Sequence, residues 1–128
     1  MTSLLLDTHA WAWAVKGHRP LSALTLQAID IAETIYVSPI SFYEISQKVR
    51  LGKWPEMAPF VSNLEFEMDL QGSSIAPLTP TIASLAGRID WPHRDPFDRM
   101  LAATALTMGL VLVSADTVFD SLPLRRAW

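Results

Sequence analysis

Short apolar runs in this chain alternate with longer segments of helical periodicity. The runs at residues 3–6, 34–37 and 111–114 are typical of strands, and the last is typical of a strand buried at the centre of a parallel sheet. Helical spacing covers residues 8–15 and 21–33. Weaker patterns predict a helix over 56–70 and strands over 74–78 and 124–126. This alternation predicts an α/β fold around a central parallel sheet, in a single domain that spans residues 1–128.

Three further helices are marked by a capping residue that stands directly before a proline. The capping residues are Ser38, Thr79 and Asp95. Such a side chain can accept the first free backbone N–H groups, and proline fits where a helix needs no N–H donor. Gly52 and Gly109 follow the first and third helices as C-terminal stop signals. The predicted helices therefore cover 39–51, a stretch from residue 80, and 96–108.

Composition narrows the setting in which the chain works. It has no cysteine, which excludes disulfides and thiolate metal sites and favours a reducing cytoplasm. Its first apolar run is too short for a secretory signal, and no stretch has the length to span a bilayer. The net charge of −3 is a mild argument against a nucleic-acid ligand. A cluster of acids that held cations would remove that acidic excess.

Four acids fall at comparable places relative to the predicted strands. Asp7 directly follows the first strand, and Asp116 follows the strand at 111–114. Glu44 lies about a turn and a half into the helix after the second strand, and Asp98 lies in the first turn of another helix. Because ligands of open α/β sheets bind beyond the carboxyl ends of the strands, we expect these acids to gather at one edge.

A cluster of carboxylates implies a particular chemistry. Neighbouring carboxylates repel one another, which raises their pKa values and costs stability unless a cation is bound. Mg²⁺ and Mn²⁺ prefer oxygen ligands, whereas zinc is disfavoured because these positions hold neither histidine nor cysteine. Such ions activate water and stabilise the charge that develops during attack on phosphorus. The residues therefore indicate hydrolysis of phosphodiester bonds.

Each acid also has a structural explanation. Asp7 could cap the helix that begins at the next residue, and Asp116 could cap a short turn. Glu44 and Lys48 have the spacing of an ordinary surface ion pair. Asp98 could serve only to favour the helix dipole. It is the coincidence of all four near one edge that favours a functional site.

Four blocks of sequence occur in a recognisable order. They are LLLDTHAW around Asp7, VSPISFYEISQK around Glu44, HRDPFDRMLAATA around Asp98, and LVSAD ending at Asp116. Together they resemble PIN-domain proteins of the VapC type, the ribonucleases of toxin–antitoxin pairs. The resemblance covers essentially the whole chain, and the third block is the most specific.

The resemblance implies a PIN-like three-layer α/β/α sandwich and endoribonuclease activity that depends on Mg²⁺ or Mn²⁺. It also implies a homodimer and a cognate antitoxin, VapB-like, that blocks the site. The site residues that it implies are Asp7 and Asp98 as the main metal ligands, joined by Glu44 and Asp116. The fourth position varies most in the family, so Asp120 is an alternative to Asp116.

Basic and aromatic residues provide further candidates for contacts. Those that could reach RNA phosphate are Lys48, Arg50, Lys53, Arg94 and Arg99, although solvated surface charge is the default explanation for each one. Those that could stack on bases are Trp11, Trp13, Trp54 and Trp91, but tryptophan in a small domain is more typical of a core or an interface.

We favour an interface for some of these tryptophans, with the first helix as its place. Trp54 is expected to form an exposed apolar knob after a helix end. His9 is expected to pack against the edge of the sheet rather than to bind a metal. The mixed, amphipathic segment 56–70 is a candidate docking site for the antitoxin.

Two other functions are compatible with an aspartate after a parallel strand. A haloacid-dehalogenase-like phosphatase requires a second aspartate two residues later, where this chain has His9. A receiver domain requires an adjacent acidic pair, which Leu6 and Asp7 do not supply. A non-catalytic binding module with the same fold is the third hypothesis, and the presence of all four acids argues against it.

Overall fold

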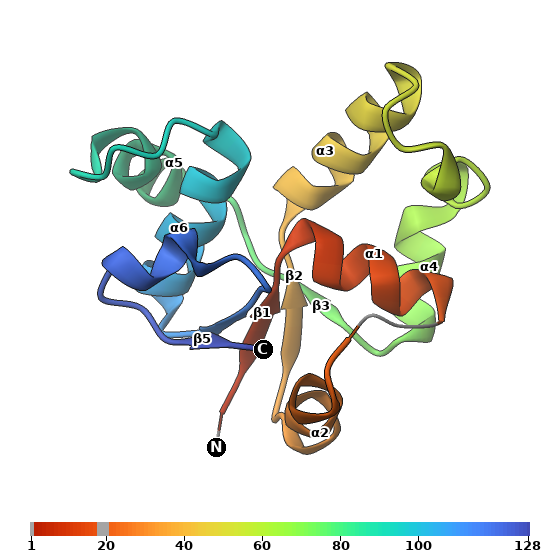
Figure 1. Cartoon of the computed structure of the whole chain (residues 1–128), viewed down its shortest axis with the longest axis horizontal. Helices are drawn as coiled ribbons and strands as arrows, with labels where there is room; N and C mark the ends of the chain where they lie inside the picture. Colours follow the sequence, from red (N-terminus) through yellow and green to blue (C-terminus); the bar gives the residue numbers. More distant parts are fainter. Residues whose placement is uncertain (1, 18–20) are drawn as a thin grey trace.

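A computed structural model describes residues 2–17 and 21–128, and in that part of the chain a five-stranded parallel sheet lies between helices (Figure 1). The order of the strands is β3-β2-β1-β4-β5, and every neighbouring pair is parallel. The strands are β1 (Leu4–Leu6), β2 (Ile35–Val37), β3 (Ser74–Ile75), β4 (Val111–Val113) and β5 (Arg126–Ala127). The predicted α/β sandwich around a parallel sheet is confirmed.

The helices begin where the capping signals place them. Ser38, Thr79 and Asp95 each accept a hydrogen bond from a backbone N–H in the first turn of the helix that follows. Gly52 and Gly109 adopt the left-handed conformation that glycine permits without strain, with φ of 72° and 66°. The α-helices are α1 (Thr8–Lys16), α2 (Ala23–Ile31), α3 (Pro39–Arg50), α4 (Leu64–Leu70), α5 (Pro80–Arg88) and α6 (Pro96–Met108).

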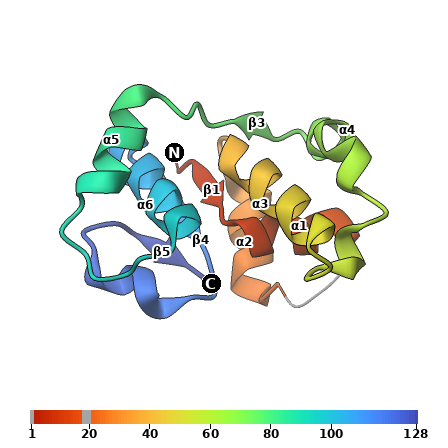
Figure 2. The same ribbon diagram turned by 90° about the horizontal axis from the view of Figure 1, so that it is seen from above.

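The alternating side chains of β1 divide the core into two halves. Leu4 and Leu6 contact the half that contains Trp11 of α1, together with residues of α2, α3 and α4. Leu5 points to the opposite face and packs against α6, beyond which α5 forms a smaller cluster around Ile82. In Figure 2 α5 and α6 accordingly lie on one side of β1, and α1 and α3 lie on the other. This is the three-layer arrangement that the resemblance implied.

The three elements that weaker patterns predicted differ from the structure. Segment 56–70 is not one helix, because prolines at 55 and 59 divide it into the 3₁₀ turns η1 (Pro55–Met57) and η2 (Val61–Asn63) before α4. The strand predicted at 74–78 ends after two residues, since Pro77 lacks an N–H donor. The last strand pairs at 126–127 rather than at 124–126, because a turn in which Leu124 N–H donates to Leu122 O precedes it.

The helix predicted at 21–33 is two residues shorter at each end. Ser22 caps it by accepting the backbone N–H of Thr25, so the helix begins at Ala23. Ala32 already has an extended backbone and leads into β2. No helix in residues 2–17 and 21–128 combines the length and the apolar character needed to cross a bilayer.

The predicted exposure of the tryptophans is partly wrong. Trp54 is 8% exposed and belongs to the core, so it is not a knob on the surface. Trp11 is 0% exposed, because its ring lies between the sheet and α3 and α4, and Trp91 is buried against Leu5 and α6. Of the tryptophans on the first helix, only Trp13 remains half-exposed, where it packs against Trp128.

Candidate active site

The sheet has a topological switch point between its two central strands, β1 and β4, because successive strands are added outward in opposite directions from this pair. β1 connects to β2 on one side, whereas β4 connects to β5 on the other. A crevice opens at the carboxyl ends of such a pair of strands, and open α/β sheets bind their ligands there. Asp7 directly follows β1, and its backbone N–H donates to Val113 O of β4 at 3.0 Å. Asp116 follows β4 in the same place.

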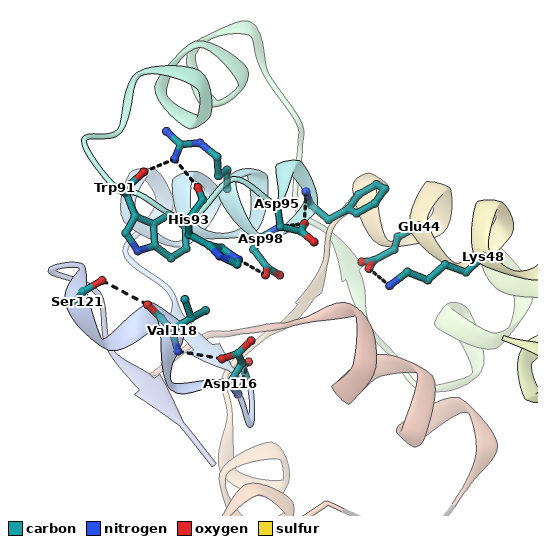
Figure 3. A network of polar contacts seen from close by, with 12 residues as sticks. Glu44, Lys48, Trp91, His93, Asp95, Asp98, Asp116, Val118 and Ser121 are labelled. Atoms are coloured by element: carbon teal, nitrogen blue, oxygen red, sulfur yellow. Dashed lines mark hydrogen bonds and ion pairs between the residues drawn. The ribbon is translucent and has the colours of Figure 1, made fainter. Parts of the chain in front are cut away.

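A pocket of about 320 Å³ lies at this crevice. Figure 3 shows Asp98 and Glu44 facing each other across it from α6 and α3, with Asp116 below them. The four acids that the sequence singled out all line the pocket, whereas Asp120 does not. The residues that line the pocket are Asp7, Thr8, His9, Glu44, Lys48, His93, Asp95, Asp98 and Asp116.

Asp7 and Asp116 both have the capping roles that the sequence allowed. Asp7 is buried, and its Oδ1 accepts the backbone N–H of Ala10 at 2.8 Å, which caps α1. Asp116 Oδ1 accepts the backbone N–H of Val118 at 2.9 Å, which caps η3 (Thr117–Ser121). A cap holds a carboxylate in one rotamer, so these hydrogen bonds also aim both acids at the pocket.

Glu44 forms the predicted ion pair, but the pair does not lie on an ordinary surface. Lys48 Nζ donates to Glu44 Oε2 at 2.6 Å, and the ammonium group lies 5.8 Å from the centre of the Trp54 ring. The glutamate itself is only 5% exposed. A hydrogen bond of 2.9 Å between Thr8 Oγ1 and Ser41 Oγ joins α1 to α3 beside it. The carboxylate therefore reaches the pocket from a helix that is firmly attached to α1.

Asp98 has no capping role, because Asp95 takes it. Asp95 Oδ1 accepts the backbone N–H groups of Phe97 and Asp98 at 2.8 and 3.1 Å, as its position before a proline predicted. The carboxylate of Asp98 instead forms a hydrogen bond of 2.7 Å between Oδ2 and Nε2 of His93. The sequence analysis missed His93 as a partner of this acid, although the two residues stand in the same block.

The electrostatic environment of the pocket favours a bound cation. Burial raises the pKa of Asp7 above its ordinary value, and the charge of Glu44 adds to the increase against opposing hydrogen bonds from Ser114 and Ala10. Burial also raises the pKa of Asp98, and Asp95 and Glu44 add to it while the hydrogen bond of His93 opposes it. A divalent cation would offset the cost of holding these carboxylates charged and close together.

The donor set suits a hard cation that keeps part of its water shell. Within residues 2–17 and 21–128, no three acidic or histidine side chains converge as they would around one fully enclosed ion. Mg²⁺ is commonly held by one or two carboxylates, with waters and substrate phosphate completing the shell. Asp7 and Asp98, with Glu44 and Asp116 nearby, match that pattern of oxygen donors.

Two expectations about basic residues are corrected by the structure. His9 is exposed and lines the pocket, where its ring stacks on Trp54 at 4.8 Å, so it does not pack against the edge of the sheet. Arg99 does not extend toward an RNA strand, because its guanidinium group donates to backbone carbonyls of residues 86–93. Neither position could be predicted from the neighbouring sequence, because His9 contacts a segment remote in the chain and the contacts of Arg99 depend on the path of a loop.

Comparisons with known proteins agree with this geometry. The family model of the PIN domain matches residues 4–124. Ribonuclease VapC22 of Mycobacterium tuberculosis is 32% identical over 119 residues, which cover 91% of this chain and 88% of that protein. DNA-bound VapBC of Salmonella typhimurium superposes with a TM-score of 0.71 at 20% identity, covering 99% of this chain and 98% of that one. VapBC2 of Rickettsia felis bound to a promoter DNA fragment superposes with a TM-score of 0.70 at 17% sequence identity, covering 99% of both chains.

The parallel sheet and the acidic crevice at its switch point define a PIN-domain protein, and the chain belongs to that family. Within the family it is of the VapC type, the ribonuclease toxins of toxin–antitoxin pairs. The resemblance seen in the four sequence blocks is thereby confirmed. The phosphatase and receiver hypotheses are set aside, because the match to a PIN domain runs through nearly the whole chain.

Proposed function

We propose that this chain is an endoribonuclease that uses Mg²⁺ or Mn²⁺ to hydrolyse phosphodiester bonds of RNA with water, as the toxin of a VapBC-type pair. The observation that carries the proposal is the gathering of Asp7, Glu44, Asp98 and Asp116 around one pocket at the switch point of the sheet. Membership of the PIN family and the similarity to a ribonuclease support the choice of RNA over other phosphodiesters.

The four acids divide the work according to their surroundings. Asp7 and Asp98 are the proposed principal ligands, because burial makes their charge costly until a cation is present. Glu44 and Asp116 complete the negative surface and orient water. When bound, Mg²⁺ or Mn²⁺ supplies positive charge and activates water for attack on phosphorus. Lys48 and His9 line the same pocket and are the proposed donors toward the phosphate of the substrate.

The proposed partner is a cognate antitoxin that docks on segment 56–70. Two large apolar side chains of α4, Phe66 and Leu70, are exposed there at helical spacing. Residues 54–87 contain four acids and no lysine, arginine or histidine, so this surface suits a cationic amphipathic segment and repels RNA. One solved structure that resembles this chain is a toxin–antitoxin complex from Klebsiella pneumoniae. A homodimer that works in the cytoplasm completes the proposal.

Removal of the cation tests the proposed reaction directly. With a labelled RNA and excess Mg²⁺ or Mn²⁺, we expect cleavage that EDTA reduces to background and that further Mn²⁺ restores. The physical reason is that the carboxylates repel the RNA phosphate unless a cation lies between them. Products should be sized on a denaturing gel to show internal cuts. Cleavage that continues in EDTA would exclude the metal-dependent mechanism.

The fourth acidic position is tested by a matched pair of substitutions. Asp116→Asn should slow cleavage by about tenfold or more, equivalent to about 1.4 kcal/mol of transition-state stabilisation, because Asp116 lines the pocket. Asp120→Asn should leave the rate near that of the unaltered protein, since both Asp120 oxygens accept hydrogen bonds from Arg126 outside the pocket. Initial rates at saturating Mn²⁺ compare the two. The reverse order of effects would move the site to Asp120.

A further inference from the structure

One arginine bonds the end of α5 and the first part of the loop that leads to α6. Arg99 Nε donates to Ala86 O at 2.8 Å, Nη2 donates to Ile89 O at 2.6 Å, and Nη1 donates to the carbonyls of Trp91 and His93, each at 2.8 Å. Figure 3 marks the last two bonds at the labelled Trp91 and His93. The guanidinium carbon also lies 6.0 Å from the centre of the Trp91 ring. A single side chain thus gathers carbonyls that span residues 86–93.

The chemistry of this contact requires arginine. A guanidinium group presents five N–H donors in a rigid plane, whereas a lysine ammonium presents three donors from one atom. Ala86 lies in the last turn of α5, where backbone carbonyls lack helical partners and the helix dipole favours a cation. Arg99 therefore closes the end of α5 and fixes the loop that follows in one contact.

The loop that Arg99 holds presents His93 to the pocket. The His93 carbonyl is one of the groups that Arg99 bonds. The imidazole ring of His93 packs against the ring of Trp91, with the two ring centroids 4.9 Å apart. From this fixed position Nε2 reaches Asp98 Oδ2 at 2.7 Å. Arg99 is adjacent to Asp98 in α6, so the same helix turn carries both the acid and the anchor of the loop that contacts it.

We propose that Arg99 and His93 act as a positioning pair: Arg99 fixes the end of α5 and the loop at 89–93, and His93 thereby holds the Asp98 carboxylate in the orientation in which it binds the divalent cation. This inference rests on the proposed metal-dependent function. Hydrogen bonds to ligating carboxylates orient them, and loss of such an outer contact typically weakens metal binding about 10- to 100-fold. Neither residue contacts the substrate in this role.

Calorimetric titration with Mn²⁺ tests the pair without relying on cleavage. His93→Ala and Arg99→Lys should each weaken Mn²⁺ binding about tenfold or more. The double variant should bind no more weakly than the worse of the two, because both substitutions remove the same contact with Asp98. His93→Gln should recover part of the affinity, since its amide can donate a comparable hydrogen bond. Arg88→Ala is the matched control, because Arg88 lies at the exposed end of α5 and bonds only Ser84 among the described contacts; its affinity should be unchanged.

The outcomes separate this inference from the proposed function. If the unaltered protein binds no Mn²⁺ in a manner that Asp98→Asn abolishes, both are overturned. If it binds Mn²⁺ but the losses from His93→Ala and Arg99→Lys simply add, or neither variant differs from Arg88→Ala, only the positioning pair is overturned. Circular dichroism checks each fold. Should Arg99→Lys fail to fold, His93→Ala decides the matter, because it leaves the Arg99 contacts in place: unchanged affinity overturns the pair and a tenfold loss supports it.

Discussion

Asp7→Asn is expected to abolish RNA cleavage while the protein still folds. Asparagine keeps an Oδ1 that can accept the Ala10 N–H and cap α1, so the local structure should survive the loss of charge. The substitution removes one of the two proposed principal ligands, and metal catalysis of this kind supplies several kcal/mol of charge stabilisation. The rate should therefore fall by about 10³-fold or more, equivalent to about 4 kcal/mol. Asp98→Asn should have an effect of the same size.

Initial rates of cleavage in Mn²⁺, together with growth arrest on induction, measure this loss. Thermal unfolding shows in parallel that each variant retains its fold. Asp30→Asn is the matched control, because Asp30 is an exposed acid of α2 that does not line the pocket. If Asp7→Asn cleaved RNA within a few-fold of the rate of the Asp30→Asn control, the proposed ligand set would be wrong.

Trp11→Ala is expected to cause the largest loss of stability. The indole is 0% exposed, its ring lies 4.8 Å from that of Phe42, and its Nε1 donates to Gln71 Oε1 at 3.1 Å. Removing it leaves a cavity between β1 and the helices that cover it. Large-to-small substitutions of buried aromatic residues cost about 3–5 kcal/mol of the free energy of unfolding, a large fraction of the stability of a domain of this size.

Denaturant unfolding followed by circular dichroism measures this loss. Trp13→Ala is the comparison, since Trp13 stands two residues later on α1 but is only half-buried, against Trp128 and His9. Its free energy of unfolding should fall by clearly less than that of Trp11→Ala. Equal losses would contradict the expected difference between the buried and the half-buried ring. A loss of self-association without a loss of stability in Trp11→Ala would place Trp11 at an interface rather than in the core.

The gathering of the acids at one pocket could be predicted from the sequence, because most of them stand next to a strong local signal. Asp7 directly follows a strand, Asp98 lies in the first turn of a helix that begins with a capping residue and a proline, and Asp116 follows an apolar run typical of a central strand. The topology of a parallel sheet then brings these ends together. The capping and ion-pair explanations that competed with function also hold in the structure, and the same side chains line the pocket.

Side chains whose environment is built by distant segments were predicted less well. Trp54 looked exposed after a helix end, but the core around α1 buries it. Arg99 looked like a surface cation on a helix, but the path of the loop at 89–93 encloses its guanidinium group. His9 looked like a packing residue, but Trp54 holds its ring at the rim of the pocket.

The sequence by itself determined the family, the alternation of helices and strands, the helix boundaries at 38–39, 79–80 and 95–96, and the set of acids that meet at the sheet. These follow from forces that act within one or two turns: capping, proline geometry and hydrophobic period. Only the tertiary structure decided which oxygen of Asp98 accepts a hydrogen bond, which lysine and arginine side chains are bonded within the fold, and which tryptophans are buried. The physical reason is that such contacts depend on the path of the loop before α6 and on segments tens of positions away, whose approach no local pattern specifies.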